Sequence, residues 1–275
     1  MKNTVLITGA STGFGKATAE LFLARGWNVA ATMRTPHDVP GAFVTALDVV
    51  DPESVRTAVA ASLERFGRVD AVINNAGYGL YGVFEQLSDA KLREQLEVNL
   101  FGVMNVTRAV LPHFRANRAG CFVNVSSGAG VFGLPMASAY NASKFALEGF
   151  SEALSYELGG LGIRVKLVEP GGVLSTRFMD RSGSEGGFTT EIADYGPFVE
   201  SSIVLFEGLK ASRGSGEDAT SEHVAEVLFE ATTDETDRLR WVATRNIEAL
   251  VRARRETSEA EYMALMRAAF APPAP

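Results

Sequence analysis

The sequence predicts an α/β fold: a doubly wound parallel sheet that carries helices on both faces and forms a single domain. Two patterns predict it. Short runs rich in Val, Ile and other apolar residues alternate with longer segments whose apolar residues recur at helical spacing. The short runs lack polar–apolar alternation, which is typical of strands that helices bury on both faces. Right-handed crossovers between such strands give a doubly wound sheet.

The first half of the chain alternates regularly between strands and helices. Residues 4–8 form the first predicted strand, and the helix that follows ends at Gly26. In the second helix, Val55, Val59 and Leu63 lie on one face. The predicted elements of this half are the strands 4–8, 29–33, 43–47 and 69–74 and the helices 14–25 and 52–66.

The second half begins with a long helix over residues 89–115, in which Leu92, Leu96 and Val103 share one face. The elements predicted after it are the strands 121–126 and 163–168 around the helix 138–158, then the helix 221–231, the strand 239–243 and a closing helix from about residue 247. The predicted domain covers residues 1–270, and residues 271–275 are expected to form a frayed tail.

Composition and charge argue against several classes of function. The chain has 275 residues and a net charge of −7 with scattered Lys and Arg, so neither nucleic acid nor an anionic membrane surface is expected as a partner. No apolar run approaches the roughly 18 residues of a membrane span, and the N-terminus enters a strand without a signal peptide, so a cytoplasmic location is expected. Cys121 is the single cysteine, which excludes an internal disulfide. His37, His113 and His223 are scattered, so no metal site is predicted.

A glycine-rich turn follows the first strand and precedes an amphipathic helix. Backbone N–H groups at such a helix N-terminus can approach an anion, and a pyrophosphate fits this position. The glycine spacing of four and then two residues differs from the common dinucleotide fingerprint. The residues expected to bind a dinucleotide here are Gly9, Ser11, Thr12, Gly13, Phe14 and Gly15.

This T-G-x-x-x-G-x-G spacing resembles the short-chain dehydrogenase/reductase family, and further motifs of that family follow in order. They are Asp48-Val49 after the third strand, Asn74-Asn75-Ala76-Gly77 after the fourth, Asn99 in the long helix, Ser126-Ser127 after the fifth strand, Tyr140 and Lys144 as Y-x-x-x-K, and Pro170-Gly171 after the sixth strand. Two departures are Glu169, where many members carry Asn, and Ser175, where Thr is usual. The resemblance covers roughly residues 4 to 245 and implies a Rossmann-type fold, an oxidoreductase that uses NAD(P), and a homo-oligomer, either a dimer or a tetramer.

The resemblance also assigns residues to the cofactor. It implies that Asp48 and Val49 contact the adenine and that Lys144 holds the nicotinamide ribose. The other residues that it implies for the cofactor are Asn75, Ala76, Gly77, Tyr140, Pro170, Gly171 and Val173.

The end of the second strand indicates which dinucleotide the chain prefers. No acidic side chain follows Met33 to accept hydrogen bonds from a ribose 2′-hydroxyl, whereas Arg34 can pair with a 2′-phosphate. NADP (NADPH) is therefore predicted over NAD. The alternative is that Arg34 is a solvated loop arginine.

Tyr140 and Lys144 are four residues apart on a predicted helix, and hence on one face. An isolated tyrosine titrates near pH ~10, and a neighbouring ammonium is expected to lower this pKa towards a value suited to acid–base catalysis. The resemblance implies that Ser127 orients the substrate oxygen, with Ser126 as the competing choice, and that Asn99 holds a water of a proton relay. These four residues predict the interconversion of an alcohol and a carbonyl compound.

An apolar segment between glycine-rich stretches, residues 176–216, is expected to close over the substrate as a lid. Its apolar members are Phe178, Met179, Phe188, Ile192, Phe198 and Leu205, and the further expected wall residues are Tyr78, Leu80, Phe132, Leu134 and Met136. A likeness to the hydroxysteroid and retinol dehydrogenase branch favours a lipophilic substrate. The alternatives are that these residues pack on the core or on a partner subunit, that the chain is a non-catalytic NAD(P)-binding regulator, or that it is an epimerase or dehydratase.

Overall fold

The computed structural model of the protein describes residues 2–173, 187–213 and 220–270. Seven strands in this part of the chain form one parallel sheet in the order β3-β2-β1-β4-β5-β6-β7. The strands are β1 (Thr4–Thr8), β2 (Asn28–Met33), β3 (Phe43–Ala46), β4 (Ala71–Asn74), β5 (Gly120–Val125), β6 (Ile163–Glu169) and β7 (Arg240–Val242). The order reverses direction after β3, which is the doubly wound arrangement. The predicted fold class is confirmed.

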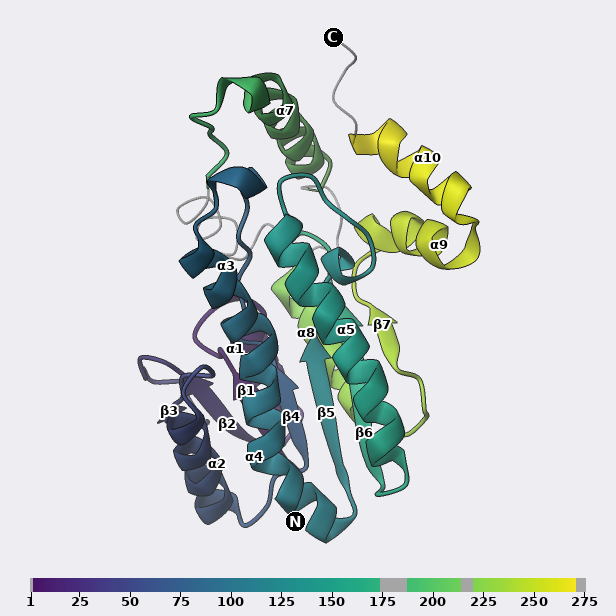
Figure 1. Ribbon diagram of the computed structural model, residues 1–275. Helices are drawn as coiled ribbons and strands as arrows, with labels where there is room; N and C mark the ends of the chain where they lie inside the picture. Colours follow the sequence, from purple (N-terminus) through teal and green to yellow (C-terminus); the bar gives the residue numbers. More distant parts are fainter. Residues whose placement is uncertain (1, 174–186, 214–219, 271–275) are drawn as a thin grey trace.

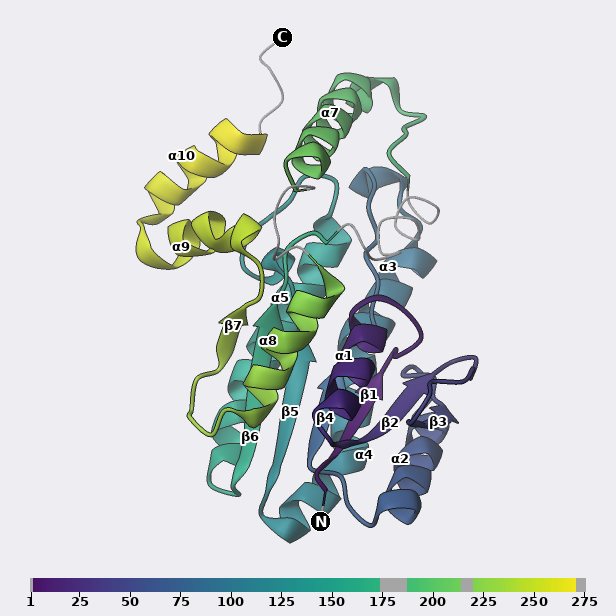
Figure 2. The same ribbon diagram turned by 180° about the vertical axis from the view of Figure 1, so that it is seen from behind.

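Helices cover both faces of the sheet (Figures 1 and 2). On one face lie α1 (Gly13–Ala24) and α8 (Ser221–Thr233), which bury Phe22 and Leu228 against the strands. On the other face lie α2 (Pro52–Phe66), α4 (Gly102–Asn117) and α5 (Ser138–Gly159). Because central strands such as β1 and β4 are buried on both sides, they need apolar residues in both alternating positions, and this explains the continuous apolar runs.

The long helix expected over residues 89–115 is interrupted. It consists of α3 (Asp89–Leu96), a π-helical turn η2 (Glu97–Phe101) and α4. A π turn holds one more residue than an α turn and frequently occurs at functional sites. Asn99 lies in this turn and is buried.

The single closing helix expected from residue 247 is two helices, α9 (Glu248–Glu256) and α10 (Glu259–Phe270). Ser258 begins α10 with a capping box: the Glu261 N–H donates to Ser258 Oγ at 3.3 Å, and the Ser258 N–H donates to Glu261 Oε2 at 3.0 Å. Val251 and Tyr262 from these helices pack together with Val131 and Phe132. The C-terminal helices are therefore fastened beside the end of β7 (Figure 1).

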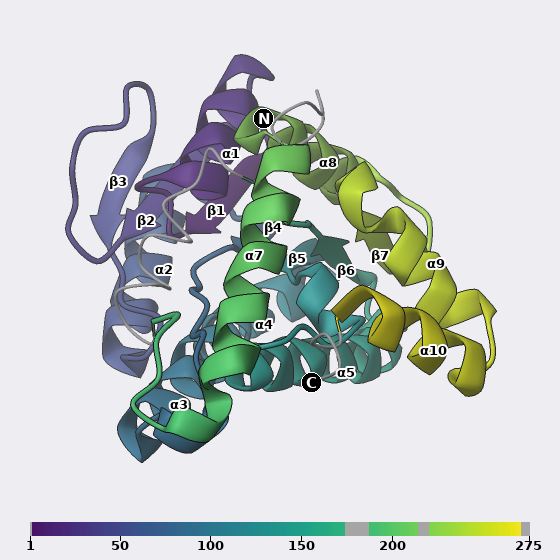
Figure 3. The ribbon, with the colours of Figure 1, turned by 90° about the horizontal axis from the view of Figure 1, so that it is seen from above.

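Part of the segment expected to form a lid is a helix, α7 (Gly196–Arg213), preceded by the 3₁₀ turn η4 (Ala193–Tyr195). Figure 3 looks down on the C-terminal ends of the strands and shows α7 running across them. Residues 176–186 and 214–216 of the expected lid lie outside the described residues, as does the expected tail, residues 271–275.

Candidate active site

The loops after β1 and β4 are tied together at the C-terminal edge of the sheet. Asn75 Nδ2 donates to the carbonyl oxygens of Thr8 at 2.9 Å and Gly9 at 3.1 Å. In return, Thr8 Oγ1 accepts from the backbone N–H groups of Asn75 and Ala76 at 3.0 and 3.1 Å. The motif after β4 therefore fixes the conformation of the glycine-rich turn.

The turn itself is shaped by two glycines. Gly9 has φ +67°, a conformation that favours glycine, and a Cβ on Gly15 would stand 2.3 Å from the Gly9 carbonyl oxygen. The Thr12 side chain does not cap α1, so it leaves the first N–H groups of that helix available to another acceptor. A close backbone turn with available N–H donors fits a pyrophosphate group.

The residues expected at the adenine end surround this turn. Arg34 is exposed at the end of β2 and forms no ion pair with a described residue. Asp48 is half-buried, and its Oδ1 accepts from the Val50 N–H at 3.2 Å. Val49 is buried against Gly102 at the start of α4. Arg34 thus remains available to an anionic ligand.

Helix α5 carries Tyr140 and Lys144 on one face, as their spacing predicts. Both side chains are buried, and Lys144 Nζ lies 5.9 Å from the centre of the Tyr140 ring. Lys144 Nζ donates to the Val125 carbonyl at the end of β5, at 2.8 Å. The Ser127 side chain hydrogen-bonds Tyr140 and also accepts from the Ala129 N–H at 3.1 Å. Three of the four predicted catalytic residues therefore converge, and of the two candidate serines it is Ser127 that contacts Tyr140.

The Asn99 side chain forms hydrogen bonds with the loop after β4 and with α5. Both amide protons of its Nδ2 are donated, to the Tyr78 carbonyl at 2.9 Å and to Ser143 Oγ at 3.0 Å. Its Oδ1 accepts from the Tyr78 N–H at 3.1 Å. Gln95, which sequence reasoning missed, holds the same loop by donating to the Tyr78 carbonyl at 2.8 Å. The Asn99 side chain therefore fastens the loop after β4 to α5.

Burial is the main influence on the pKa values of Tyr140 and Lys144. It raises the pKa of Tyr140 well above the ordinary value, the neighbouring Tyr81 raises it further, and the hydrogen bond from Ser127 opposes both. Burial lowers the pKa of Lys144 to about 8, against the opposing influence of Glu148. The expectation that the pKa of Tyr140 falls is therefore wrong for the protein by itself, because a phenolate in an apolar site lacks hydration. Tyr140 is a neutral acid here.

Aromatic side chains pack around the Tyr81 ring, which lies beside the Tyr140 ring, and we call Tyr81, Tyr140, Phe188 and Phe206 the aromatic cluster. The Tyr81 ring centre lies 6.0 Å from that of Tyr140 and 5.9 Å from those of Phe188 and Phe206. Phe206 comes from α7, so the described part of the expected lid does reach the site. Tyr81 was not predicted, because the loop after β4 gives no local pattern that identifies an inward residue.

The predicted wall residues divide between this site and other clusters. Leu134 packs against the aromatic cluster, and Met136 is buried beside it with Val199 from α7. Tyr78 and Leu80 are instead fully buried between the loop after β4 and α5, and Phe132 packs against α9 and α10. For these three the prediction is wrong. Phe178 and Met179 lie outside the described residues.

The loop after β6 closes the other side of the site. The Pro170 carbonyl accepts from the Gly128 N–H at 3.0 Å, and the Gly171 N–H donates to Thr244 Oγ1 at 2.8 Å. Val173 is buried at the last described position before the gap. Glu169, the departure from the family's asparagine, is completely buried and turns towards Arg255, whose Nη2 lies 2.5 Å from its Oε1. The second departure, Ser175, lies outside the described residues.

Two further findings concern the described part of the chain. It contains no group of three or more His, Cys, Asp or Glu side chains able to hold a metal ion. None of its helices combines the length and the apolar character needed to cross a bilayer.

Comparison with known proteins gives the same family as the motifs. The family model for short chain dehydrogenase matches residues 3–186. The 3-ketodihydrosphingosine reductase of Bacteroides thetaiotaomicron is 42% identical over 205 residues, which are 74% of this chain and 75% of that protein.

Solved structures share the whole fold. A short-chain dehydrogenase from Streptomyces avermitilis has a TM-score of 0.81 and 31% identity, over 98% of this chain and 97% of that one. A short-chain dehydrogenase/reductase from Burkholderia phymatum in complex with NAD has a TM-score of 0.76 and 27% identity, over 100% and 97% of the two chains. The protein ElxO with NADP bound has a TM-score of 0.70 and 25% identity, over 88% and 97%. With its glycine-rich turn, its Tyr140–Lys144 pair and these relatives, the chain belongs to the short-chain dehydrogenase family and is an oxidoreductase.

Proposed function

We propose that the chain interconverts an alcohol and a ketone or aldehyde with NADP(H), and that Tyr140 is the acid–base residue. The observation that carries this proposal is the convergence of Ser127, Tyr140 and Lys144 at the edge of the sheet where the glycine-rich turn lies. In open α/β sheets, ligands bind beyond this edge. The three side chains come from two neighbouring elements, the end of β5 and α5.

Each side chain has a distinct task. A bound nicotinamide dinucleotide supplies or takes up the hydride. Tyr140, protonated because burial raises its pKa, donates its hydroxyl proton to the oxygen of a carbonyl substrate. Ser127, already within hydrogen-bonding reach of that hydroxyl, orients the same oxygen and stabilises the charge that develops on it. Lys144 provides a positive charge beneath the Tyr140 ring that favours the phenolate left after proton transfer.

The proposed cofactor preference rests on the end of β2. Arg34 is exposed beside the glycine-rich turn, and no carboxylate follows Met33 to repel a 2′-phosphate. Structural relatives have been solved with NADP and with NAD, so either dinucleotide fits this fold. We therefore assign NADP to this chain on the charge at Arg34.

The proposed substrate is lipophilic. The Tyr81 ring lies beside that of Tyr140, and Phe188 and Phe206 pack against Tyr81. These apolar surroundings favour an apolar ketone over a small polar one. The relative named 3-ketodihydrosphingosine reductase supports a long-chain keto compound as the first substrate class to test.

The proposal also includes a homo-oligomer, a dimer or tetramer, in the cytoplasm. Phe101, Phe145 and Tyr156 are large side chains that remain exposed on η2 and α5, with Tyr156 76% accessible. Exposed aromatic residues of this kind are typical of surfaces that a partner covers. Light scattering of the purified protein tests this part, and a monomer at all concentrations contradicts it.

The test of the proposed reaction is the oxidation of NADPH in the presence of ketones of increasing chain length. We expect turnover with the long-chain ketones and a loss of at least about a hundredfold in Tyr140→Phe, because the ring still packs but has no proton to donate. NADPH affinity should stay close to that of the wild type. Tyr156→Phe, on the exposed face of the same helix, is the matched control and should keep full activity. More than about a tenth of the wild-type rate in Tyr140→Phe contradicts the assignment.

A further inference from the structure

The turn that follows β7 lies against the loop that follows β6. It contains the 3₁₀ turn η5 (Arg245–Ile247), and we call Thr244, Asn246 and Ile247 the β7 clamp. Thr244 and Ile247 are buried, whereas Asn246 is exposed. Thr244 occupies the N-cap position of η5, but its side chain does not cap that turn, so its hydroxyl is free to serve a different contact.

Hydrogen bonds join the β7 clamp to the backbone of the loop after β6. Thr244 Oγ1 accepts from the Gly171 N–H at 2.8 Å and donates its own proton to Asn246 Oδ1 at 2.6 Å. Asn246 Nδ2 donates to the Gly172 carbonyl at 3.1 Å. The two side chains therefore hold an N–H group and a carbonyl group of consecutive glycines through one chain of hydrogen bonds.

Packing brings the same loop close to the β7 clamp. A Cβ on Gly171 would stand 2.0 Å from Asn246 Oδ1 and 2.8 Å from Ile247 Cγ2, so no residue larger than glycine fits there. The contact is thus a direct approach of loop backbone to the clamp side chains, and a change in these side chains acts on the position of the backbone.

The β7 clamp also reaches the loop that carries Ser127. A Cβ on Gly128, the next residue, would stand 3.3 Å from Ile247 Cδ1. The Gly128 N–H in turn donates to the Pro170 carbonyl at 3.0 Å, which joins the loop after β5 to the loop after β6. Both loops therefore take their positions from one buried side chain and from each other.

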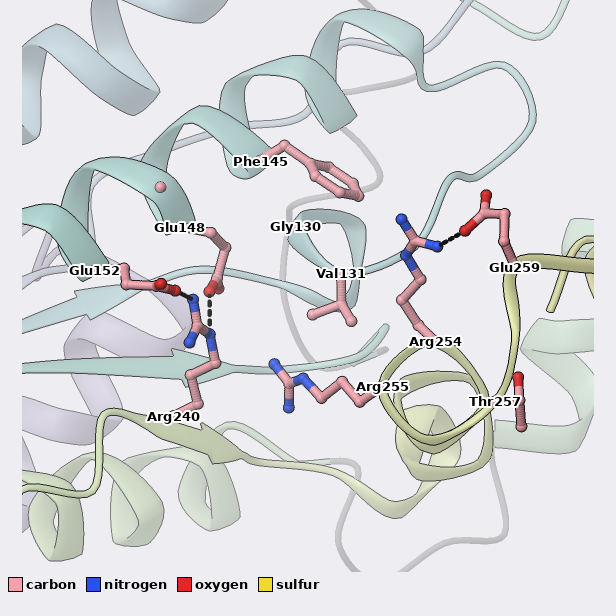
Figure 4. A pocket seen from close by; sticks show the side chains of 11 residues that line it. Gly130, Val131, Phe145, Glu148, Glu152, Arg240, Arg254, Arg255, Thr257 and Glu259 are labelled. Atoms are coloured by element: carbon pink, nitrogen blue, oxygen red, sulfur yellow. Dashed lines mark hydrogen bonds and ion pairs between the residues drawn. The ribbon is translucent and has the colours of Figure 1, made fainter.

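Ion pairs hold the elements on either side of the β7 clamp. Arg240 Nε, from β7, lies 2.9 Å from Glu148 Oε2, and its Nη2 lies 2.5 Å from Glu152 Oε2. Arg255 Nη2, from α9, lies 2.5 Å from Glu169 Oε1 at the end of β6. Figure 4 shows Arg240 and Arg255 reaching towards α5 from the opposite wall of a cavity of about 630 Å³. The turn between β7 and α9 is thus anchored at both ends.

The loop after β6 lies at one end of the proposed cofactor site. Arg34, proposed to pair with a 2′-phosphate, follows β2, and the glycine-rich turn follows β1. Ser127 follows β5, and Tyr140 lies beside it on α5. In the strand order β2-β1-β4-β5-β6, a dinucleotide that extends from Arg34 to the catalytic residues brings its nicotinamide to the ends of β5 and β6.

We propose that Thr244 and Asn246 are positioning residues for the nicotinamide end of the dinucleotide, because they hold Gly171 and Gly172 where this loop meets the nicotinamide. The inference rests on the proposed function for the class of cofactor. Hydride transfer requires the reacting atoms to lie about 3–3.5 Å apart, so a small displacement of the loop lowers the rate strongly. Four strands separate β7 from β2 in the sheet, so the adenine half binds independently of the clamp.

The experiment compares two probes by calorimetric titration of the full-length protein: NADPH, and adenosine 2′,5′-bisphosphate, which is the adenine half without the nicotinamide. Thr244→Val keeps the shape of the side chain and suits its extended backbone, but it removes the hydroxyl. We expect the affinity for NADPH to fall by about fivefold to tenfold, because the Gly171 N–H loses its acceptor. The affinity for adenosine 2′,5′-bisphosphate should stay within about twofold of that of the wild type.

Thr232→Val is the matched control. Thr232 and Thr244 are both 2% exposed, and the Thr232 hydroxyl donates to the Leu228 carbonyl at 2.6 Å. It lies near Asn3 and Gly120, at the opposite edge of the sheet, so its loss should change neither affinity. Thr244→Ser keeps the hydroxyl and should restore both the NADPH affinity and kcat, which we expect to fall by about tenfold in Thr244→Val.

Asn246→Ala guards against a failure of Thr244→Val to fold, because Asn246 is exposed. It removes the hydrogen bond to the Gly172 carbonyl and should also weaken NADPH while the adenine half binds normally. Equal losses for the two probes, or an unchanged NADPH affinity in Thr244→Val, overturn the proposal. If Thr244→Val does not fold, the same two outcomes in Asn246→Ala decide against it.

Failure of this inference and failure of the proposed function give different results. A selective loss of NADPH affinity in a protein that reduces no carbonyl compound supports the clamp and contradicts the proposed reaction. Turnover of long-chain ketones without a selective loss in the variants does the reverse. If the wild type binds NADH in place of NADPH, the cofactor preference is contradicted, and NADH and ADP-ribose become the two probes of the clamp.

Discussion

The Tyr140 side chain is hydrogen-bonded by Ser127, and its ring centre lies 6.0 Å from that of Tyr81. Lys144 lies beneath the same ring and is held by a main-chain carbonyl. These contacts fix both side chains before any substrate arrives, so little rearrangement is needed for proton transfer. The pKa of Lys144, about 8, also places its charge change close to neutral pH.

Arg34 is the residue on which the predicted preference for NADPH over NADH depends. In Arg34→Asp, a carboxylate repels the 2′-phosphate and accepts hydrogen bonds from a 2′-hydroxyl. We expect the affinity for NADPH to fall by about tenfold and that for NADH to stay equal or rise. Fluorescence titration of both dinucleotides measures this.

Arg56→Asp makes the same change of charge on the exposed face of α2 and should alter neither affinity. Wild-type protein that binds NADH as tightly as NADPH is the outcome that rules out the preference.

Some residues of the candidate site could be predicted from the sequence, and others could not. Tyr140 and Lys144 could be placed on one helix face from their spacing, whereas Ser127 was expected from the resemblance to the family's motifs. Tyr81 and Arg255 were not, since their contacts with Tyr140 and Glu169 depend on how distant loops and helices meet. The direction of the pKa of Tyr140 was missed for the same reason: charge can be read along the chain, but burial is a property of the assembled site.

At the scale of elements, the sequence predicts helix boundaries that local motifs set, but not irregular turns that contacts between distant residues stabilise. The capping box at Ser258 and Glu261 is visible in the sequence and accounts for the break between α9 and α10, although periodicity alone suggested one helix. The π turn η2 has no such signal. Its apolar residues continue the ordinary helical pattern, and the extra residue is stabilised by the contacts of Asn99 with Tyr78 and Ser143.

Gly15 in α1 and Gly208 in α7 allow the same substitution, glycine to alanine, to be compared in two helices. Gly15→Ala inserts a methyl group 2.3 Å from the Gly9 carbonyl oxygen and 2.5 Å from Asn75 Nδ2, so the turn must open and dinucleotide affinity should fall by about tenfold or more. Gly208→Ala, on the exposed face of α7, meets no atom within 4 Å.

Gly208→Ala should stabilise α7 by about 1 kcal/mol, because alanine has a higher helix propensity than glycine. Hydrogen exchange of the α7 amides should slow by about fivefold while dinucleotide affinity stays the same. Unchanged dinucleotide binding in Gly15→Ala contradicts the assigned role of the turn.

At the scale of the whole molecule, the site depends on segments far apart in the chain. The sheet brings the end of β1, near the N-terminus, beside the ends of β4 and β5, and the Glu169–Arg255 pair joins the end of β6 to α9. The predicted class of fold was correct because buried parallel strands have a recognisable composition. The attachment of α9 and α10 could not be predicted, since it rests on ion pairs and packing between elements.

The Glu169–Arg255 ion pair, which attaches α9 to β6, predicts that the effect of removing Arg255 on the free energy of unfolding depends on pH. Arg255→Ala removes the main partner of a buried carboxylate, so we expect the free energy of unfolding to fall by about 2 kcal/mol at neutral pH, less than for a fully buried pair because Arg255 is 35% exposed. Burial already raises the pKa of Glu169, and the loss of Arg255 raises it further. Since protonation removes the unpaired charge, the destabilisation should shrink as the pH falls through the pKa of Glu169 in the folded variant.

Urea unfolding at two pH values measures this loss. Adding Glu169→Gln to the variant should restore part of the stability at neutral pH. Arg252→Ala on the exposed face of the same helix is the control, with an expected change within about 0.5 kcal/mol. A loss that does not depend on pH contradicts the electrostatic explanation.

Arg255 follows Glu169 by 86 residues along the chain, and this separation has a consequence for biosynthesis. A growing chain folds from its N-terminus, and β6 with Glu169 is made well before α9 leaves the ribosome. During that interval, neither Arg240 nor Arg255 has been synthesised. The nascent sheet then exposes the edge of β6, and Glu169 at the end of this strand has no arginine with which to form an ion pair. An ionised Glu169 should resist burial at this stage and delay the final closure of the sheet. Helix α9, which is made after β6 and β7, thus completes the ion pairs of the buried Glu169.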